Sequence, residues 1–221
     1  MTGMDRETDR LVTMLSLERE AGEQGFSRVA GADEVGRGAL AGPIVAAAVI
    51  IGDFQALRGV KDSKQLSAKA RERLAEVIKS TAIAWTVHEV SAERIDTLGI
   101  QEANRLVLQG ALEKLSPAYD LALVDGMIIP TFSPSVRRVI KGDKISLSIA
   151  AASIVAKVYR DSMMSIDVHR AYPLYGFDGH KGYGSSAHIT ALTMHGLCPE
   201  HRRSFAPCRY LAEAEGTRKK D

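Results

Sequence analysis

The chain has 221 residues, of which 45% are hydrophobic and 25% are charged. This length suits one domain of ordinary to large size, and the composition is average for a soluble globular protein, which excludes a disordered or fibrous chain. The net charge of +2 excludes a histone-like binder, so any affinity for nucleic acid must come from local clusters of basic residues.

Apolar periodicity and turn residues predict an alternation of helices and strands along the chain. In chain order, we predict a helix at 6–23, strands at 28–33 and in PIVAAAVII, a helix after the N-cap Ser67, a strand at 82–90, a helix at 100–115, a strand in YDLALVDG, a strand at 136–141, helices at 145–168 and 186–196, and a helical or frayed tail from 211. This alternation indicates an α/β fold with a mixed sheet.

The cysteine content and the apolar runs indicate where the protein works. Cys198 and Cys208 are too few for a disulfide framework and indicate a reducing compartment. The charged N-terminal stretch has no signal-peptide core. The longest nearly apolar run, ALAGPIVAAAVIIG, is too short to span a bilayer and is interrupted by Gly42 and Pro43. We therefore expect a soluble, cytoplasmic protein without membrane contact.

The stretch AGADEVGRG places two adjacent carboxylates, Asp33 and Glu34, between apolar segments. One interpretation is a polar turn between two strands. The other is a shared site for both acids. Because successive strand side chains point to opposite faces, this second interpretation requires a bend, for which Gly36 and Gly38 provide freedom.

Two further acids lie at similar junctions. Asp125 ends an apolar strand, where ligand sites of α/β sheets usually lie. Asp143 precedes the long predicted helix, so it either caps that helix or faces the same pocket. Four such acids would repel one another unless divalent cations were bound. Oxygen ligands without neighbouring Cys or His select Mg²⁺ or Mn²⁺, and such a cage usually serves phosphate chemistry through two ions.

Three other segments are candidates for phosphate or sugar binding. The Gly36-Arg37-Gly38 motif offers open backbone and a guanidinium, although a tight turn explains it equally well. The loop with Lys61, Ser63 and Lys64 is a phosphate candidate, whereas a solvated helix face explains the basic residues after it. Tyr183 lies between two glycines, where it either stacks on a sugar or base and reaches a 2′-OH or anchors its loop.

A zinc site formed by His195, Cys198, His201 and Cys208 is disfavoured, because their spacing contains no paired CxxC or HxxxH element. We expect His195 to close a helix, where it suits the helix dipole. The two cysteines are expected to behave as small hydrophobic residues.

Six segments together resemble bacterial ribonuclease HII, the type 2 ribonuclease H. They run in the family's order from about residue 28 to 207: AGADEVGRGALAGPIVAAAVI, VKDSKQLS, LVDG, KGDKISLSIAAASIVAKVYRD, HKGYGSSAH and HRRSFAP. The resemblance implies a ribonuclease H-like fold, with a mixed five-stranded sheet flanked by helices and a helical C-terminal part. We expect a single domain over 1–221, with an N-terminal helix to about 25, a catalytic core over about 28–207 and a C-terminal helix or tail over about 208–221.

The resemblance also implies an activity: cleavage of RNA in RNA–DNA hybrids, and incision on the 5′ side of a single ribonucleotide in duplex DNA, as in ribonucleotide excision and RNA primer removal. The products would carry a 3′-OH and a 5′-phosphate. Asp33, Glu34, Asp125 and Asp143 would be the active-site acids and would hold two Mg²⁺ or Mn²⁺ ions, with Asp33 shared between them. The rival interpretations are another two-metal nuclease and a hybrid-binding protein without catalysis.

The resemblance assigns the remaining candidates to substrate binding. Gly36, Arg37 and Gly38 would recognise the sugar and the adjacent phosphate of the ribonucleotide, and Tyr183 its 2′-OH. The other implied contacts, to the substrate backbone, come from Lys61, Ser63, Lys64 and Lys181. Because no unused apolar stripe is evident, we expect a monomer.

Overall fold

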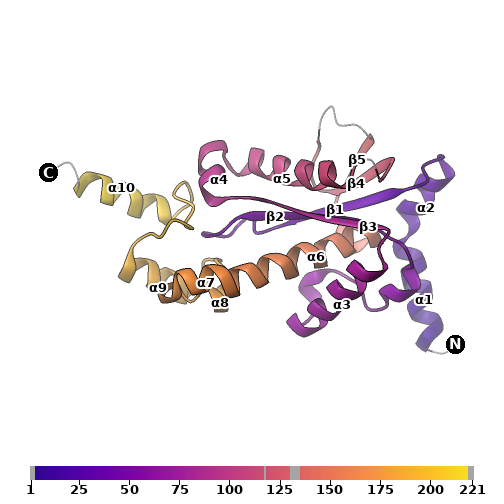
Figure 1. Cartoon of the computed structure of the whole chain (residues 1–221), viewed down its shortest axis with the longest axis horizontal. Coiled ribbons are helices and arrows are strands. Elements are labelled where there is room, and N and C mark those ends of the chain that lie inside the picture. Colours follow the sequence, from indigo (N-terminus) through magenta and orange to yellow (C-terminus); the bar gives the residue numbers. More distant parts are fainter. Residues whose placement is uncertain (1–2, 117, 130–134, 219–221) are drawn as a thin grey trace. The chain divides into compact units, whose positions relative to one another are not determined.

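The computed structural model describes residues 3–116, 118–129 and 135–218 (Figure 1). In this part of the chain the strands are β1 (Val29–Val35), β2 (Ile44–Ile50), β3 (Ala84–Val90), β4 (Leu121–Asp125) and β5 (Ser135–Val139). The α-helices are α1 (Gly3–Met14), α2 (Ser16–Glu23), α3 (Ala68–Thr81), α4 (Ala92–Leu98), α5 (Ile100–Leu115), α6 (Leu147–Met163), α7 (His169–Ala171), α8 (Phe177–His180), α9 (Ser186–His195) and α10 (Cys208–Arg218).

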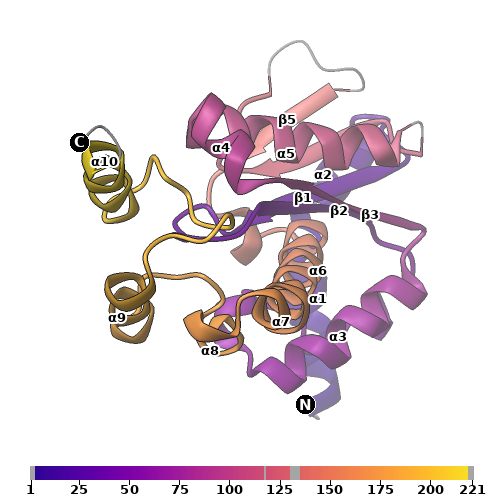
Figure 2. The same cartoon turned by 60° about the vertical axis from the view of Figure 1, so that its left-hand side comes forward.

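The strands form one mixed sheet in the order β3-β2-β1-β4-β5. β1 pairs antiparallel with β2 and parallel with β4, and β4 pairs parallel with β5. All seven residues of β2 are buried, as expected for a strand covered on both faces. Figures 1 and 2 show α5 on one face of the sheet and α6 on the other. The predicted mixed five-stranded sheet flanked by helices is therefore confirmed.

The chain divides into two compact units. The first unit consists of Met1–Val35, Val45–His88 and Arg105–Val158, and it contains the sheet. The second unit consists of Gly36–Ile44, Glu89–Asn104 and Tyr159–Asp221, and it contains α4 and α7 to α10. The single domain expected from the sequence stays a prediction, and the two units are described separately below.

Close packing of α6 on β1 organises the first unit. A Cβ atom on Gly31 would lie 2.2 Å from the carbonyl carbon of Ser148 and 2.3 Å from the amide nitrogen of Ile149, so only glycine lets the helix approach this strand. Ile149 packs with Leu121 and Leu123 of β4 in a buried cluster.

The second unit is largely helical and is built around buried aromatic residues. Tyr175 and Phe177 stack with their ring centroids 5.5 Å apart, and they share a cluster with Met164, Ala191 and Cys198. The C-terminal helix expected from about residue 208 is present as α10, and residues 219–221 lie outside the described part of the chain.

Several element boundaries differ from the sequence prediction. The single helix expected at 6–23 is two helices, α1 and α2, with a break at Leu15. The long helix ends at Met163 and continues as a π-helical turn, Met164–Val168. α4 was not predicted, although the hydroxyl of Ser91 caps it by accepting the amide hydrogen of Arg94 at 3.2 Å. Ser67 caps α3 as expected. Across the described residues, no helix is long and apolar enough to cross a membrane.

Candidate active site

Asp33 and Glu34 lie inside β1, and the strand pairs regularly with β2 through Val35. Neither the polar turn nor the bend expected for a shared site is found at these two residues, and the chain turns only after Val35, where Gly36 has a φ of +90°. Asp33 is 7% exposed. Burial raises the pKa of its carboxyl well above the usual range, and the negative charges of Glu34 and then Asp125 add to this effect.

Asp125 and Asp143 are brought together by a backbone contact. Oδ1 of Asp125, the last residue of β4, accepts the amide hydrogen of Gly142 at 2.7 Å, which holds the 3₁₀ turn Gly142–Lys144 against the end of the strand. Asp143 lies in this turn and does not cap α6. The hydroxyl of Ser146 accepts the amide hydrogen of Ile149 there instead, at 3.2 Å.

The pKa of Asp143 is also raised, first by burial and then by the negative charges of Asp62 and Asp125, against the opposing effect of Lys64 and Lys144. Charge repulsion therefore links Glu34 to Asp33, Asp33 to Asp125, and Asp125 to Asp143. These acids come from three separate parts of the sequence, and all of them belong to the first unit.

A divalent cation suits the chemistry of these acids. All of them offer oxygen ligands, as Mg²⁺ and Mn²⁺ require, and a bound cation would offset the burial and mutual repulsion that raise the pKa values of Asp33 and Asp143. Within residues 3–116, 118–129 and 135–218, however, no group of three or more His, Cys, Asp or Glu side chains is arranged closely enough to hold a metal ion. The acids thus approach one another in pairs, and their role as metal ligands stays a prediction.

Two buried hydroxyls support Asp33. The hydroxyl of Ser153, on α6, hydrogen-bonds to the Asp33 carboxyl and partly offsets the rise in its pKa. Oγ of Ser63 lies 3.0 Å from Oγ of Ser153, and both side chains are buried. Ser63 therefore reaches the first acid through Ser153, and its predicted contact with substrate stays a prediction. Its neighbours Lys61 and Lys64 are exposed.

A pocket of about 360 Å³ in the first unit brings Asp143 next to the basic loop. Lys61, Asp62 and Gln65 line one part of it, and Asp143 and Lys144 another. Arg10, Thr13 and Met14 of α1 complete the lining. The pocket therefore places one candidate acid beside one candidate phosphate-binding lysine, whereas Asp33, Glu34 and Asp125 are not among its lining residues.

The Gly36-Arg37-Gly38 loop belongs to the second unit, where buried arginines hold its backbone. A Cβ atom on Gly36 would lie 2.3 Å from Nε of Arg160, so the loop needs glycine here both for space and for its positive φ. Arg202, which is fully buried, donates hydrogen bonds to the carbonyl oxygens of Gly42 at 2.9 Å and Arg37 at 3.1 Å.

Tyr183 lies in the second unit as well, and its ring packs on Arg160. The guanidinium carbon is 5.3 Å from the ring centroid. Arg160 is fully buried and donates to the carbonyl oxygens of Ala41 and Pro43, and to that of Lys181 at 3.0 Å. One side chain thus connects the two loops that the sequence proposed for sugar recognition. Lys181 itself has a positive φ of 53°, and its ammonium group donates to the carbonyl oxygen of Asp178.

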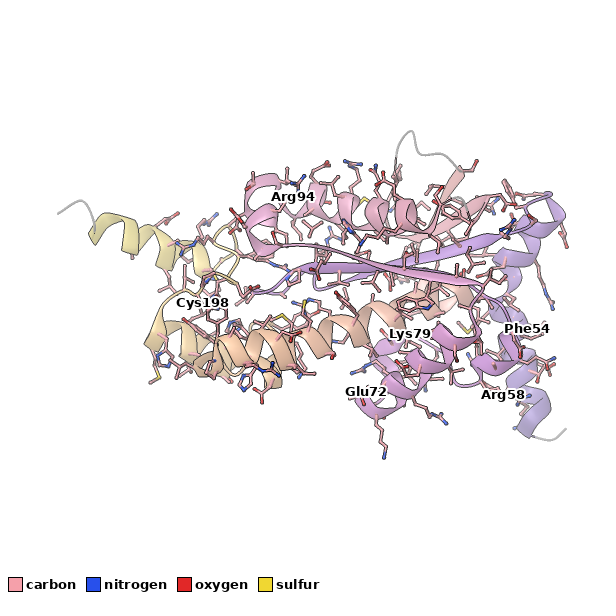
Figure 3. All side chains as sticks on the ribbon, in the orientation of Figure 1. Phe54, Arg58, Glu72, Lys79, Arg94 and Cys198 are labelled. Atoms are coloured by element: carbon pink, nitrogen blue, oxygen red, sulfur yellow. The ribbon has the colours of Figure 1, made fainter. Side chains whose placement is uncertain are left out.

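Three supporting residues were missed in the sequence, namely Ser153, Arg160 and Arg202. Arginines are usually exposed, so nothing in the pattern of charges identifies two that are wholly buried. The zinc alternative gains no support. His195 ends α9 as predicted, and both cysteines are buried. Figure 3 labels Cys198 in the segment between α9 and α10.

Comparison with known proteins shows which family this chain belongs to. The family model for ribonuclease HII matches residues 30–208. Ribonuclease HII of Ruminiclostridium cellulolyticum is 46% identical over 201 residues, covering 91% of this chain and 78% of that protein. Ribonuclease HII of Nitrosococcus oceani is 51% identical over 187 residues, covering 85% and 92%. The crystal structure of ribonuclease H2 from Pyrococcus horikoshii OT3 superposes with a TM-score of 0.73 at 28% identity, covering 85% of this chain and 98% of that one. The chain belongs to the ribonuclease HII family and is a ribonuclease H, an endonuclease that hydrolyses phosphodiester bonds.

Proposed function

We propose that this ribonuclease H cleaves RNA in RNA–DNA hybrids and incises duplex DNA on the 5′ side of a single embedded ribonucleotide, leaving a 3′-OH and a 5′-phosphate. The observation that carries the proposal is the electrostatic coupling of Asp33 to both Glu34 and Asp125. A buried carboxyl whose charge is opposed by two other acids is costly for the fold, and such perturbed groups are typical of a catalytic centre. Such an enzyme would serve ribonucleotide excision and RNA primer removal.

We propose that Asp33, Glu34, Asp125 and Asp143 hold Mg²⁺ or Mn²⁺, with two ions present when substrate is bound. Divalent ions in such a site supply Lewis-acid stabilisation of phosphate charge and lower the pKa of bound water. The protein's own contribution is to keep the acids in place. The Gly142 amide orients Asp125, and the Ser63–Ser153 hydroxyl pair orients Asp33.

We assign recognition of the ribonucleotide in the substrate to residues of the second unit. Because the sugar differs from deoxyribose only by its 2′-OH, recognition needs a hydroxyl or backbone group held at one place. Gly36, Arg37 and Gly38 would contact the sugar and its phosphate, and Tyr183 would detect the 2′-OH and stack at the RNA–DNA junction. The anchoring of both loops by Arg160 supports this assignment, because a loose loop could not resolve a single oxygen atom. Lys61, Lys64 and Lys181 would add salt-dependent affinity for the substrate backbone.

Cleavage of a labelled DNA duplex with one ribonucleotide tests the proposal. An all-DNA duplex of the same sequence is the control, and each is incubated with Mg²⁺, with Mn²⁺ and with EDTA. We expect one cut on the 5′ side of the ribonucleotide with either metal, none with EDTA and none in the control. Cleavage of the all-DNA duplex would favour a two-metal nuclease of another kind, and cleavage in EDTA would rule out the metal site.

A further inference from the structure

Two buried imidazoles connect Tyr183 to the segment after α9. Nδ1 of His188 lies 3.0 Å from the carbonyl oxygen of Tyr183, and Nε2 of His188 lies 3.0 Å from Nε2 of His201. Nδ1 of His201 lies 2.9 Å from the amide nitrogen of Cys198 and 3.3 Å from the carbonyl oxygen of the same residue, so its role follows from the hydrogen on the other ring nitrogen. His188 is fully buried and His201 is 2% exposed. These residues all belong to the second unit.

The positions of the hydrogen atoms follow from the partners. A carbonyl oxygen only accepts, so Nδ1 of His188 must carry a hydrogen, and in a neutral ring Nε2 is then a bare acceptor. His201 must therefore donate from its Nε2, which leaves its Nδ1 bare to accept the amide hydrogen of Cys198. Hydrogen bonds thus run in one direction, from Cys198 through His201 and His188 to Tyr183.

The environment keeps both rings neutral. Burial lowers the pKa values of His188 and His201 to about 4. Repulsion from other cationic groups opposes protonation further: a protonated His188 acts on His201 most strongly, and His180 on both rings and Arg203 on His201 contribute less. A second proton on His188 would place two N–H groups face to face across the 3.0 Å contact between the Nε2 atoms, and one on His201 would place an Nδ1–H group against the amide N–H of Cys198. The directed arrangement is therefore the one that these surroundings permit.

The loop that carries Tyr183 needs such external support. Lys181 and Gly182 both have positive φ, at 53° and 82°, and a run of two such residues is unusual. A third imidazole supports it from the other side, because Nδ1 of His180 accepts the amide hydrogen of Gly182 at 3.2 Å and Nε2 donates to the carbonyl oxygen of Tyr175 at 2.8 Å. The rings of His180 and His188 stack with their centroids 4.3 Å apart.

We propose that His188 and His201 are positioning residues for substrate selection: their directed hydrogen-bond chain holds the main chain of Tyr183 at the place where its side chain meets a single ribonucleotide. This inference rests on the role proposed above for Tyr183. Neither histidine touches the substrate. Their effect on cleavage therefore depends on Tyr183. A general contribution of the two histidines to folding would not depend on Tyr183.

A double-mutant cycle tests this dependence. His188→Phe keeps a flat ring but removes both hydrogen bonds, and it is compared with Tyr183→Ala and with the double variant. On duplex DNA with one ribonucleotide, we expect His188→Phe to lower kcat/KM about tenfold, the effect of roughly one lost buried hydrogen bond. On a long RNA–DNA hybrid the loss should be smaller. In the Tyr183→Ala background, His188→Phe should change little, because residues that act in series are not additive.

The outcomes separate the two proposals. If Tyr183→Ala cleaves the single-ribonucleotide duplex at the wild-type rate, the role proposed for Tyr183 fails and takes the inference with it. If Tyr183→Ala is slow but His188→Phe slows it tenfold again, the role of Tyr183 stands and the inference is overturned. His195→Phe is the matched control, since His195 is exposed at the end of α9 and lies outside the hydrogen-bond chain.

The unmodified protein provides a second test, which does not depend on any variant folding. Imidazole ¹⁵N NMR near pH 7 reports which ring nitrogen carries the hydrogen. We expect the hydrogen on Nδ1 in His188 and on Nε2 in His201, with both rings neutral. The opposite tautomer in either ring, or a charged ring, would overturn the directed chain.

Discussion

At the scale of the residue, Asp33 is a buried carboxyl whose charged form opposes folding. Its pKa is raised by burial and by Glu34 and Asp125, so the unfolded chain holds the charge more easily than the folded one. Asp33→Asn removes this charge while keeping the shape. We expect cleavage to fall about 1,000-fold, since several kcal/mol of metal-assisted stabilisation are lost. The metal-free protein should melt a few degrees higher, at roughly 2–4 °C per kcal/mol.

Asp120→Asn is the matched control for this change. Asp120 accepts the amide hydrogens of Ser27 and Arg28, which helps to lower its pKa, so its charge favours folding. The same change of acid to amide should leave cleavage intact and should not raise the melting temperature. Full activity of Asp33→Asn in the cleavage assay would remove Asp33 from the active site.

At the scale of the element, the contact between β1 and α6 determines where Ser153 meets Asp33. Gly31→Ala would place a Cβ atom 2.2 Å from the Ser148 carbonyl carbon, and backbone atoms of a helix cannot move aside individually. α6 would have to shift as a whole. We expect a loss of about 1–3 kcal/mol in unfolding free energy, measured by urea denaturation, as for other overpacked cores. Cleavage should fall too, because Ser153 moves with the helix.

Gly22→Ala is the matched control for Gly31→Ala. Gly22 lies in α2, where an added Cβ atom meets nothing within 4 Å, so alanine should be neutral or slightly stabilising. If Gly31→Ala unfolds at the same urea concentration as Gly22→Ala, the close approach of α6 to β1 does not require glycine at position 31.

At the scale of the whole molecule, the buried histidines make stability depend on pH. Their pKa values fall from 6.5 to about 4 on folding, so the unfolded chain takes up protons first, and stability is lost as the pH falls from about 6.5 to 4. At pH 5 one such group costs about 2 kcal/mol. The raised pKa values of Asp33 and Asp143 act in the opposite sense.

A comparison of variants isolates the histidine contribution. The acids are the same in the wild type and in His188→Phe, so their effects cancel in the difference between the two unfolding free energies. We expect the advantage of the wild type to shrink by about 2 kcal/mol between pH 7 and pH 5, in urea titrations at each pH. A difference that does not change with pH would show that the buried pair does not resist protonation.

Much of the fold could be predicted because its signals are local. The apolar run of β2, the strand predicted at 82–90 and the cap at Ser67 depend on neighbours in sequence, and all three elements appear in the structure. The boundaries of the helices and strands could be predicted less well than their presence. β1 continues through Asp33 and Glu34 because β2 supplies partners for both, and acidic residues give no sign of such pairing. α4 was missed because the segment is short.

The acids of the candidate site could be proposed from the sequence, but the residues that hold them and the neighbouring loops in place could not. The chemistry of Asp33, Glu34, Asp125 and Asp143 allowed them to be proposed as metal ligands without a structure, and that role stays a prediction. Arg160, Arg202 and Ser153 were missed, because the structural role of a buried hydrogen-bond donor depends on which acceptor it contacts. Their acceptors lie far away in sequence, as the contacts of Arg160 with Ala41 and Arg202 with Gly42 show.

Residue identity and local pattern are enough to give the available chemical groups, namely four carboxylates, a Gly-Arg-Gly loop and a tyrosine between glycines, and the order of helices and strands. The folded chain is needed to show that Asp33 is coupled to Asp125, that Arg160 holds two loops at once, and that the hydrogen bonds of His188 and His201 run in one direction. Hydrogen-bond partners, burial and repulsion between distant groups depend on position in space, and that position is a property of the folded chain.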